Sequence, residues 1–380
     1  MDIISDKMKK GKERKMPEKE KVRQKVRQKK KKTYADFGVD VKKISRTQSQ
    51  IGTMISSTHS FISGGKVLSG FGSYAGILDL GGTLLALHAD GVGSKVLVAQ
   101  MMNRFDTVGL DCIAMNVNDI VCVGARPQAF LDYIALKSQN ETLLKEIMRG
   151  LVRAASLSDV AIIGGETAIL PDVISGYDDR AFDLAGMAIG MLKPSEYISG
   201  KKINVDDVIV GVESSGLHSN GYSLARNVLL SKYSIEEVPS YMHRSVGEEL
   251  LIPTRLYVRP VTEILNNIDD ILVHGLAHIT GGSFTKLSRL NKSVNYVLDK
   301  LPSAKGIFKQ IQMDGRVDPA EMYRTFNMGI GFCVVVPQGS VDCVIRIFDR
   351  YNMKCVIVGK VDNHGRGDVI VKLDNKNVVL

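Results

Sequence analysis

The strongest constraint on the fold is a repeated pattern in which a short apolar run, suited to a buried strand, ends in glycine and an acidic residue. Residues 83–87 lead into Asp90, and residues 160–163 lead into 164–166. Between such runs the sequence has helical periodicity, as in 140–158, where apolar residues recur every three or four positions. Strands that alternate with helices and end in polar tips predict a layered α/β domain with its site at those tips.

The length of the chain predicts two domains, because 380 residues exceed what one hydrophobic core usually serves. The character of the sequence changes near 193–204, where proline, serine and glycine gather. We therefore expect an N-terminal domain over 33–200 and a C-terminal α/β domain over 201–380.

The net charge of +9 is concentrated in residues 1–32, which hold fifteen Lys or Arg and five Asp or Glu. The rest of the chain is close to neutral, so the charge says nothing about the ligand of the folded part. We expect 1–32 to be a disordered basic tail. It could be a solvated tail without function, an upstream start before a true beginning near Met16, or a contact for nucleic acid or another polyanion.

Composition and cysteine use predict a cytoplasmic protein with no membrane span. No apolar run is long enough to cross a bilayer, and the N-terminus lacks the apolar core of a signal peptide. The five cysteines lie in apolar segments without a CxxC pair, which favours buried free thiols over disulfides or zinc.

The segment 88–95 is the first candidate phosphate site. Asp90 could hold Mg²⁺, Gly91 and Gly93 would let a phosphate approach the backbone, and Lys95 offers a positive charge. The alternative is an ordinary strand, glycine turn and helix start with a surface lysine.

Upstream, Gly70 and Gly72 belong to a glycine-rich loop over 69–76, which either approaches a ligand closely or is simply flexible. Its spacing matches neither a Walker A motif nor a dinucleotide fingerprint.

A predicted helix over 106–120 carries polar residues among apolar ones. Asp111 and Asp119 fall on one face with Met115 between them, and Asn118 is also within helical reach. Buried carboxylates need a partner or a metal. The alternative is that Asp111 caps the helix and Asp119 lies on the surface.

Two polar loops in the second half repeat the strand, loop and helix pattern. His218, Ser219 and Asn220 precede one helix, where hydroxyl, amide and backbone N–H groups favour a phosphate or carboxylate; an ordinary N-cap is the alternative. Thr280 precedes a glycine pair and another expected helix, and His278 beside it is a candidate site residue or a structural histidine.

Taken together, these segments resemble the phosphoribosylformylglycinamidine cyclo-ligase family, also called aminoimidazole ribonucleotide synthetases. The resemblance covers 33–380 with the pieces in family order. The matching pieces are residues 34–40, 70–72, 90–95, 111–119, 164–168, 215–223, 274–282 and 322–327.

The resemblance implies two α/β domains, with N-terminal strands that build a barrel across a homodimer. It implies that ATP and formylglycinamidine ribonucleotide are converted to aminoimidazole ribonucleotide, ADP and phosphate in purine biosynthesis, with Mg²⁺ on the ATP. Relatives with the same fold, such as selenophosphate synthetase and thiamine monophosphate kinase, are alternatives. The first normally needs a reactive cysteine or selenocysteine in the glycine loop, and this chain has none before Cys112.

The resemblance also assigns roles by motif. The implied Mg²⁺ ligands are Asp90, Asp111 and Asp119. The implied nucleotide contacts are Gly70, Gly72, Asp90, Gly91, Gly93, Lys95, Asn116 and Asn118. The implied catalytic groups are His218, His278, Glu166 and Lys95, and the implied substrate contacts are Ser219, Asn220, Thr280 and Gly281.

This chain departs from the family pattern at Ser69 and Ser73 in the glycine loop, at Ser94 where threonine is usual, and at Phe37. Ile169 and Leu170 follow the Gly-Gly-Glu-Thr-Ala segment, where an acid is commoner in the family.

Overall fold

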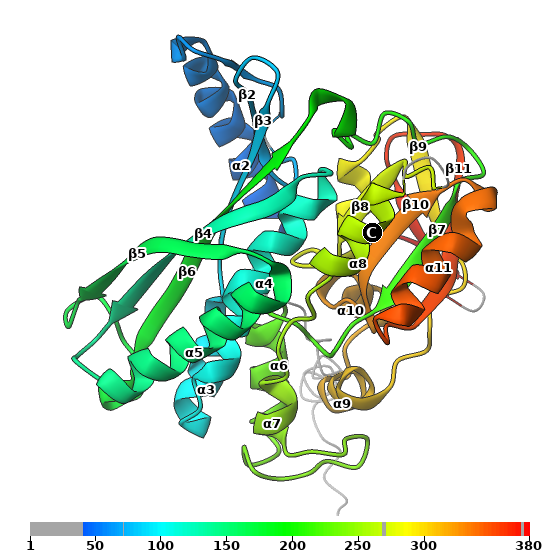
Figure 1. The fold of residues 1–380 in the computed structure, drawn as a ribbon. Helices are drawn as coiled ribbons and strands as arrows, with labels where there is room; N and C mark the ends of the chain where they lie inside the picture. The colour runs from blue at the N-terminus through cyan, green and yellow to red at the C-terminus, as the bar shows by residue number, and fades with distance from the viewer. Residues whose placement is uncertain (1–40, 71, 268–270, 374–375) are drawn as a thin grey trace, which may run out of the picture.

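The structure is a computed structural model that describes residues 41–70, 72–267, 271–373 and 376–380, and Figure 1 shows two β-sheets with helices around them. The expected basic tail, 1–32, and the matched segment 34–40 lie outside the described residues. No helix in these ranges is long and apolar enough to cross a membrane.

The first half of the chain forms a six-stranded sheet whose neighbours are antiparallel, except for β4 with β5. In spatial order its strands are β1 (Lys66–Val67), β2 (Gly76–Asp79), β3 (Leu84–Gly91), β6 (Phe182–Leu192), β4 (Arg126–Leu136) and β5 (Ala161–Ile169). The helices of this half are α2 (Val41–Ser56), η2 (Ser57–Phe61), η3 (Gly93–Lys95), α3 (Val96–Met102), α4 (Asp106–Cys122), α5 (Glu141–Ser158), η4 (Asp178–Arg180) and η5 (Pro194–Glu196).

Helix α4 lies along one face of this sheet, with α5 beside it (Figure 1). The two helices approach closely because both carry glycine at the crossing. A Cβ on Gly109 would meet the Ile147 carbonyl oxygen at 2.4 Å, and one on Gly150 would meet the Asp106 carbonyl oxygen at 1.9 Å. Asn140 caps α5 by accepting a hydrogen bond from the Leu143 N–H at 3.0 Å. This packing buries almost all of α4, including its polar residues.

The second half forms a seven-stranded sheet in which only β12 and β9 pair in parallel. In spatial order its strands are β13 (Lys376–Val379), β12 (Val369–Leu373), β9 (Val294–Leu298), β11 (Cys355–His364), β7 (Val208–Glu213), β10 (Ile330–Val336) and β8 (Gly275–His278). Its helices are α6 (Tyr222–Leu229), α7 (Val246–Leu250), α8 (Val258–Asn266), η6 (Ser283–Arg289), α9 (Gly306–Gly315), α10 (Pro319–Thr325), η7 (Gln338–Ser340) and α11 (Val341–Arg350).

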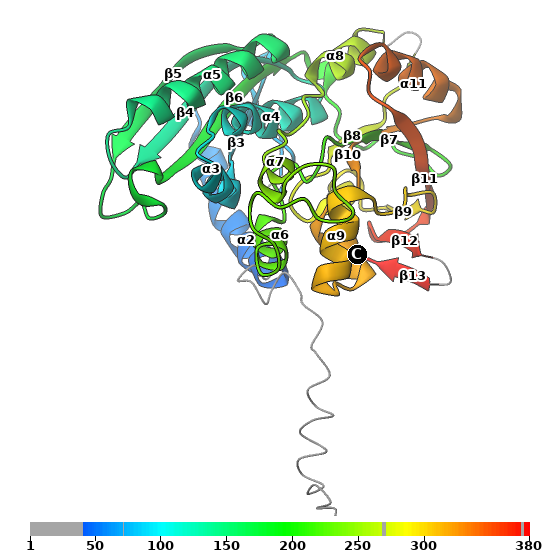
Figure 2. The same cartoon turned by 90° about the horizontal axis from the view of Figure 1, so that it is seen from below.

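The two halves share one hydrophobic core, because the buried apolar residues form a continuous cluster from Tyr74 to Val371. Helix α4 lies at the junction and contacts β8 and α8 of the second half (Figure 2). All five cysteines are free thiols, as expected, although Cys343 and Cys355 are only partly buried.

Most predicted elements are present with small shifts at their ends. The apolar pattern of 129–136 predicts a strand, and β4 begins earlier, at Arg126. The pattern over 95–103 predicts one helix, which the structure divides into η3 and α3. The helix predicted after the Gly281-Gly282 pair, through Leu290, is the 3-10 helix η6. The α/β layered, two-part fold expected from the sequence is confirmed.

Candidate active site

The candidate site is organised by a row of polar side chains on α4, which we call the α4 row: Asp111, Asn116, Asn118 and Asp119. All four are at most 4% exposed. A buried polar group costs free energy unless it is hydrogen-bonded. Most partners of the α4 row come from the second half of the chain, so the row joins the two halves.

Asp111 forms a buried ion pair with Lys95. The Lys95 Nζ lies 2.7 Å from Asp111 Oδ2, and both side chains have no exposed surface. The other oxygen, Oδ1, accepts hydrogen bonds from the Thr254 N–H at 2.7 Å and from Ser219 Oγ at 3.0 Å. Burial lowers the pKa of Lys95, and the charge of Asp111 offsets part of that effect. The structure thus places Lys95 and Asp111 inside the protein, facing each other.

Asp119 lies between two histidines. His278 Nδ1 is 2.7 Å from Asp119 Oδ1, and His88 Nε2 is 3.2 Å from Asp119 Oδ2. Burial alone would raise the pKa of Asp119, but the His88 charge and the hydrogen bonds from both histidines hold it well below its usual value. Burial works against a charged His88, yet the neighbouring Asp119 raises the His88 pKa above its ordinary value. The carboxylate is therefore ionised at neutral pH.

The two asparagines of the α4 row hold backbone segments in place. Asn118 donates to the Arg255 carbonyl oxygen at 2.9 Å and accepts from the Tyr257 N–H at 2.9 Å, which fixes the segment before α8. Asn116 donates to the Asp90 carbonyl oxygen at 3.2 Å, which fixes the end of β3. Both amides position neighbouring groups and have few bonds left for a nucleotide.

His218 and Asn220 each have a buried side-chain nitrogen without a hydrogen-bond partner among the described residues. His218 is fully buried with φ of +62°, a left-handed conformation that is rare outside glycine. Its Nε2 accepts from the Ser215 N–H at 3.3 Å, and burial lowers its pKa well below the usual value. The ring is therefore neutral, with its proton on Nδ1. That Nδ1 and the Asn220 Nδ2 are buried without any partner in the described chain.

The loop after β8 lies beside Asn220. A Cβ on Gly281 would meet Asn220 Oδ1 at 2.9 Å, so these two predicted residues are neighbours. Thr280 is 4% exposed, and its carbonyl oxygen accepts from the Ser283 N–H at 2.7 Å. His278 uses both ring nitrogens, because Nε2 also lies 3.4 Å from Asn118 Nδ2. These contacts suit a histidine that positions Asp119.

Asp90 is exposed at the end of β3, where its Oδ1 accepts a hydrogen bond from the Gly91 N–H at 2.8 Å. Partial loss of hydration raises the Asp90 pKa, and the His88 charge opposes this rise. Gly93 and Gly72 adopt φ of +65° and +92°, where a side chain would be strained. Gly70 has open space beside it, so the glycine loop leaves room near the backbone.

Glu166 is not brought to this group of residues. It lies on β5, exposed and paired in register with Tyr133 of β4. Two strands separate β5 from β3 in the sheet, which places the two strands about 14 Å apart. Within the described ranges, no hydrogen bond or ion pair connects Glu166 with Asp90 or Asp119.

The sequence reasoning missed two basic residues on η6, Lys286 and Arg289. Their helix contacts the end of the glycine loop, since Tyr74 donates its hydroxyl to the Lys286 carbonyl oxygen at 3.1 Å and Arg289 lies 5.8 Å from the Tyr74 ring centre. Burial and the Arg289 charge lower the pKa of Lys286 to about 8, while the charges of Asp119 and Asp90 oppose this. Lys286 makes no ion pair with any described residue. In the sequence, the position of Lys286 shortly after the Gly281-Gly282 pair was the feature that could have pointed to it.

The described ranges contain no group of three His, Cys, Asp or Glu side chains placed to hold a metal ion. Mg²⁺ is usually bound through one or two carboxylates together with substrate phosphates and water. The exposed Asp90 fits that type of binding, whereas both oxygens of Asp111 are already engaged.

Comparison with known proteins gives matches over both halves. Residues 72–192 match the family described as AIR synthase related protein, N-terminal domain, and residues 204–372 match the corresponding C-terminal domain. A phosphoribosylformylglycinamidine cyclo-ligase of Methanocaldococcus jannaschii is 46% identical over 357 residues, 92% of this chain and 99% of that protein. The protein of that name from Methanothermobacter thermautotrophicus is 46% identical over 88% of this chain and 95% of its own length.

Among solved structures, a hydrogenase maturation protein HypE in complex with ATP has a TM-score of 0.58 at 16% identity, covering 78% of this chain and 84% of its own. A thiamine-monophosphate kinase from Stenotrophomonas maltophilia has a TM-score of 0.57 at 19% identity, covering 84% and 95%. These likenesses show the shared fold. The cyclo-ligase relatives, by contrast, match in sequence along nearly the whole chain, and the chain therefore belongs to the phosphoribosylformylglycinamidine cyclo-ligase family.

Proposed function

We propose that this chain is an ATP-dependent cyclo-ligase that converts formylglycinamidine ribonucleotide to aminoimidazole ribonucleotide, with release of ADP and phosphate, in cytoplasmic purine biosynthesis. The observation that carries this conclusion is 46% identity to a cyclo-ligase over 92% of the chain and 99% of that relative. We also propose that the domains are 33–200 and 201–380, with the reaction between them.

The chemistry requires activation of an amide oxygen, which is a poor leaving group. ATP would phosphorylate that oxygen, the neighbouring amidine nitrogen would attack the same carbon, and the ring would close as phosphate leaves. The protein mainly has to position the groups and offset the charge. Both free groups identified above suit this task, because the His218 Nδ1–H and the Asn220 amide can donate hydrogen bonds to an oxygen of the substrate.

Mg²⁺ bound to ATP would neutralise charge on the phosphates, and we propose that Asp90 holds it. Asp119, whose two oxygens contact His278 and His88, would add negative charge nearby without binding the ion. Asp111 and Lys95 would act indirectly, by fixing η3 and α4 against the second half of the chain. His278 would position Asp119, and Lys286 would contact an anionic group of a substrate.

We further propose that the chain is a homodimer, joined through the sheet face opposite α4. Side chains alternate along β4, so that Phe130 and Ile134 are fully buried while Tyr133 is 42% exposed. On β6, Met191 is 44% exposed beside the buried Leu192. An exposed apolar sheet face of this kind marks an interaction site.

The proposed activity is tested with purified protein, MgCl₂, ATP and formylglycinamidine ribonucleotide, scored for aminoimidazole ribonucleotide and ADP in equal amounts. Thiamine monophosphate and selenide serve as substrates for the related activities. Product from either of these, with none from the amidine, would replace the cyclo-ligase assignment.

The alternative role, polyanion binding through the basic tail, is tested by deleting residues 1–32. The cyclo-ligase proposal predicts that ring closure continues at an unchanged rate, whereas a protein acting through its tail would lose its binding and retain no other activity.

A further inference from the structure

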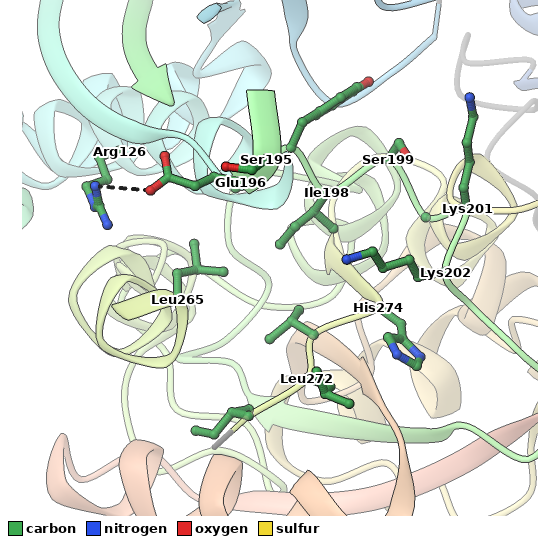
Figure 3. A pocket seen from close by; sticks show the side chains of 15 residues that line it. Arg126, Ser195, Glu196, Ile198, Ser199, Lys201, Lys202, Leu265, Leu272 and His274 are labelled. Carbon is green, nitrogen blue, oxygen red and sulfur yellow. Dashed lines mark ion pairs between the residues drawn. The ribbon is translucent and has the colours of Figure 1, made fainter. Parts of the chain in front are cut away.

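A separate cavity of about 490 Å³ lies where the chain passes from its first half to its second. That volume is in the range of small-molecule sites. Arg126 of β4, linker residues 195–202 and the segment 271–274 before β8 all contribute to its lining (Figure 3). It shares no lining residue with the α4 row, and a molecule bound in it would contact both halves of the chain.

One side of this cavity, the hinge cavity, is apolar. Ile198 of the linker faces it together with Leu265 of α8 and Leu272 (Figure 3). Leu272 is 58% exposed. A large aliphatic side chain exposed at the wall of a cavity favours a ligand with an apolar body.

The unpaired positive charge in the hinge cavity comes from one lysine, because the Glu196 carboxylate in the lining pairs with Arg126 at 3.8 Å (Figure 3). Lys202 extends its ammonium group into the cavity beside Ile198, whereas the adjacent Lys201 points away (Figure 3). The Lys202 ammonium makes no ion pair or hydrogen bond with the part of the chain that the structure describes, and its carbonyl oxygen accepts from Asn204 Nδ2 at 2.8 Å. The other basic groups are engaged: Arg126 donates to Asn266 Oδ1 at 2.7 Å, and His274 Nδ1 lies 2.7 Å from Asp207 Oδ2.

The backbone beside Lys202 adds hydrogen-bond donors. The Ile203 N–H donates to the Gly200 carbonyl oxygen at 3.1 Å, which closes a turn, and Gly200 has φ of +75°. The N–H groups of Gly200 and Lys201 donate to no acceptor within the described ranges. Free N–H groups at such a turn favour a bound anion.

We propose that the hinge cavity is a binding site for a small organic anion, distinct from the cyclo-ligase site. Its anionic group contacts Lys202 and the turn at Gly200, and its apolar body packs between Ile198 and Leu272. Because the ligand contacts both halves of the chain, its binding stabilises their arrangement.

The test uses anilinonaphthalene sulfonate, a small organic anion whose fluorescence rises in apolar surroundings. The full chain is titrated with saturating MgCl₂ and a non-hydrolysable ATP analogue, so that the nucleotide site stays filled. Phenylnaphthylamine, which has the same rings without the sulfonate, serves as the uncharged control probe. Lys202→Met removes the charge and keeps the apolar stem, and Lys201→Met is the matched control.

We expect one sulfonate probe per chain, with affinity about tenfold lower in Lys202→Met and unchanged in Lys201→Met, because a hydrogen bond to a charged group contributes at least that much. The uncharged probe should bind equally to both variants, and Leu272→Glu should weaken both probes. Equal sulfonate affinity in the two lysine variants would overturn the site, as would a Leu272→Glu protein that binds like the natural one. Since every readout is binding, the result is independent of ring-closing activity.

Discussion

At the scale of single residues, the site contains two kinds of polar side chain. Some have all their hydrogen bonds within the protein, and others have a buried polar atom without a partner. His278 uses both nitrogens within the protein, while His218 and Asn220 each have one buried nitrogen left over. A buried donor without a partner costs free energy, so a ligand that supplies the partner gains affinity. The unpartnered atoms are therefore better candidates for substrate contacts than the fully bonded His278.

The carboxylate of Asp90 is the clearest metal candidate. Asp90→Asn keeps the shape of the side chain and its hydrogen bond to Gly91 but removes the negative charge. We expect at least a hundredfold loss of kcat, because charge stabilisation by one group is commonly worth that much, with an unchanged melting temperature. Asp172→Asn, a change at another exposed carboxylate, is the control, and an active Asp90→Asn enzyme would remove Asp90 from the metal site.

Lys286 gives a prediction about pH. With a pKa of about 8, its ammonium is charged below pH 8 and loses its charge above it. The KM for one of the two anionic substrates should therefore rise as pH increases from 7 to 9. Lys286→Arg should flatten this rise, because arginine stays charged, while Lys286→Met should raise that KM about tenfold already at pH 7. KM values that follow the same pH course in all three proteins would contradict the assignment.

The same lysine should also affect folding. As pH increases, substrate binding should weaken, whereas the protein without substrate should become more stable. The unfolded chain, with a lysine pKa of 10.5, binds a proton between pH 8 and 10.5 that the folded chain releases. The free energy of unfolding should thus rise over this interval relative to Lys286→Met, and show no difference in slope below pH 8. Chemical denaturation at several pH values measures both slopes.

At the scale of elements, α4 joins the two halves of the molecule. Its Asp111 and Asn118 bind Thr254 and the backbone at Arg255 and Tyr257, all in the second half. These residues are buried on a helix whose other side packs on the first sheet. A polar row of this kind specifies one arrangement of the halves, because any other would leave a carboxylate buried and unpaired.

The Asp111–Lys95 pair tests this role of α4. Lys95→Met should cost about 3–5 kcal/mol of unfolding free energy, because it leaves an uncompensated buried charge. The double variant with Asp111→Leu should lose less, since no charge is stranded. Lys145→Met breaks the exposed pair with Glu141 and should change stability little. Urea unfolding compares the variants, and a Lys95→Met protein as stable as Lys145→Met would show that the pair does not support the structure.

The sequence predicted the elements well and the partners of the polar residues less well. The helix over 106–120 follows from periodicity, and α4 confirms it. Burial of its acids was one of two alternatives, and both Asp111 and Asp119 are buried rather than capping or on the surface. From the sequence, the partner of Asp111 could have been a metal ion or a basic side chain. Its hydrogen-bond partner Thr254 lies 143 residues further along the chain. Local pattern cannot choose between these, because the choice depends on how the second half docks. The pairing of Lys95 with Asp111 was not predicted for the same reason.

At the scale of the whole molecule, the two sheets differ in how completely they are covered. The second sheet and the inner face of the first contribute to one continuous core. The outer face of the first sheet exposes Tyr133 and Met191 at 42% and 44%. Apolar sheet surface of this kind is usually covered by a partner, and a second copy of the chain is the partner that we propose.

Tyr133→Glu tests the dimer, since it places a charge on that face, on β4 between β5 and β6. Burying an unpaired carboxylate in an interface is strongly unfavourable, so we expect the variant to sediment as a 41.6 kDa monomer while the natural chain sediments at twice that mass. Val238→Glu, at a residue that is 56% exposed on the loop after α6, should remain dimeric. A Tyr133→Glu protein that still forms dimers would show that the subunits meet elsewhere, and a monomeric natural chain would refute the dimer itself.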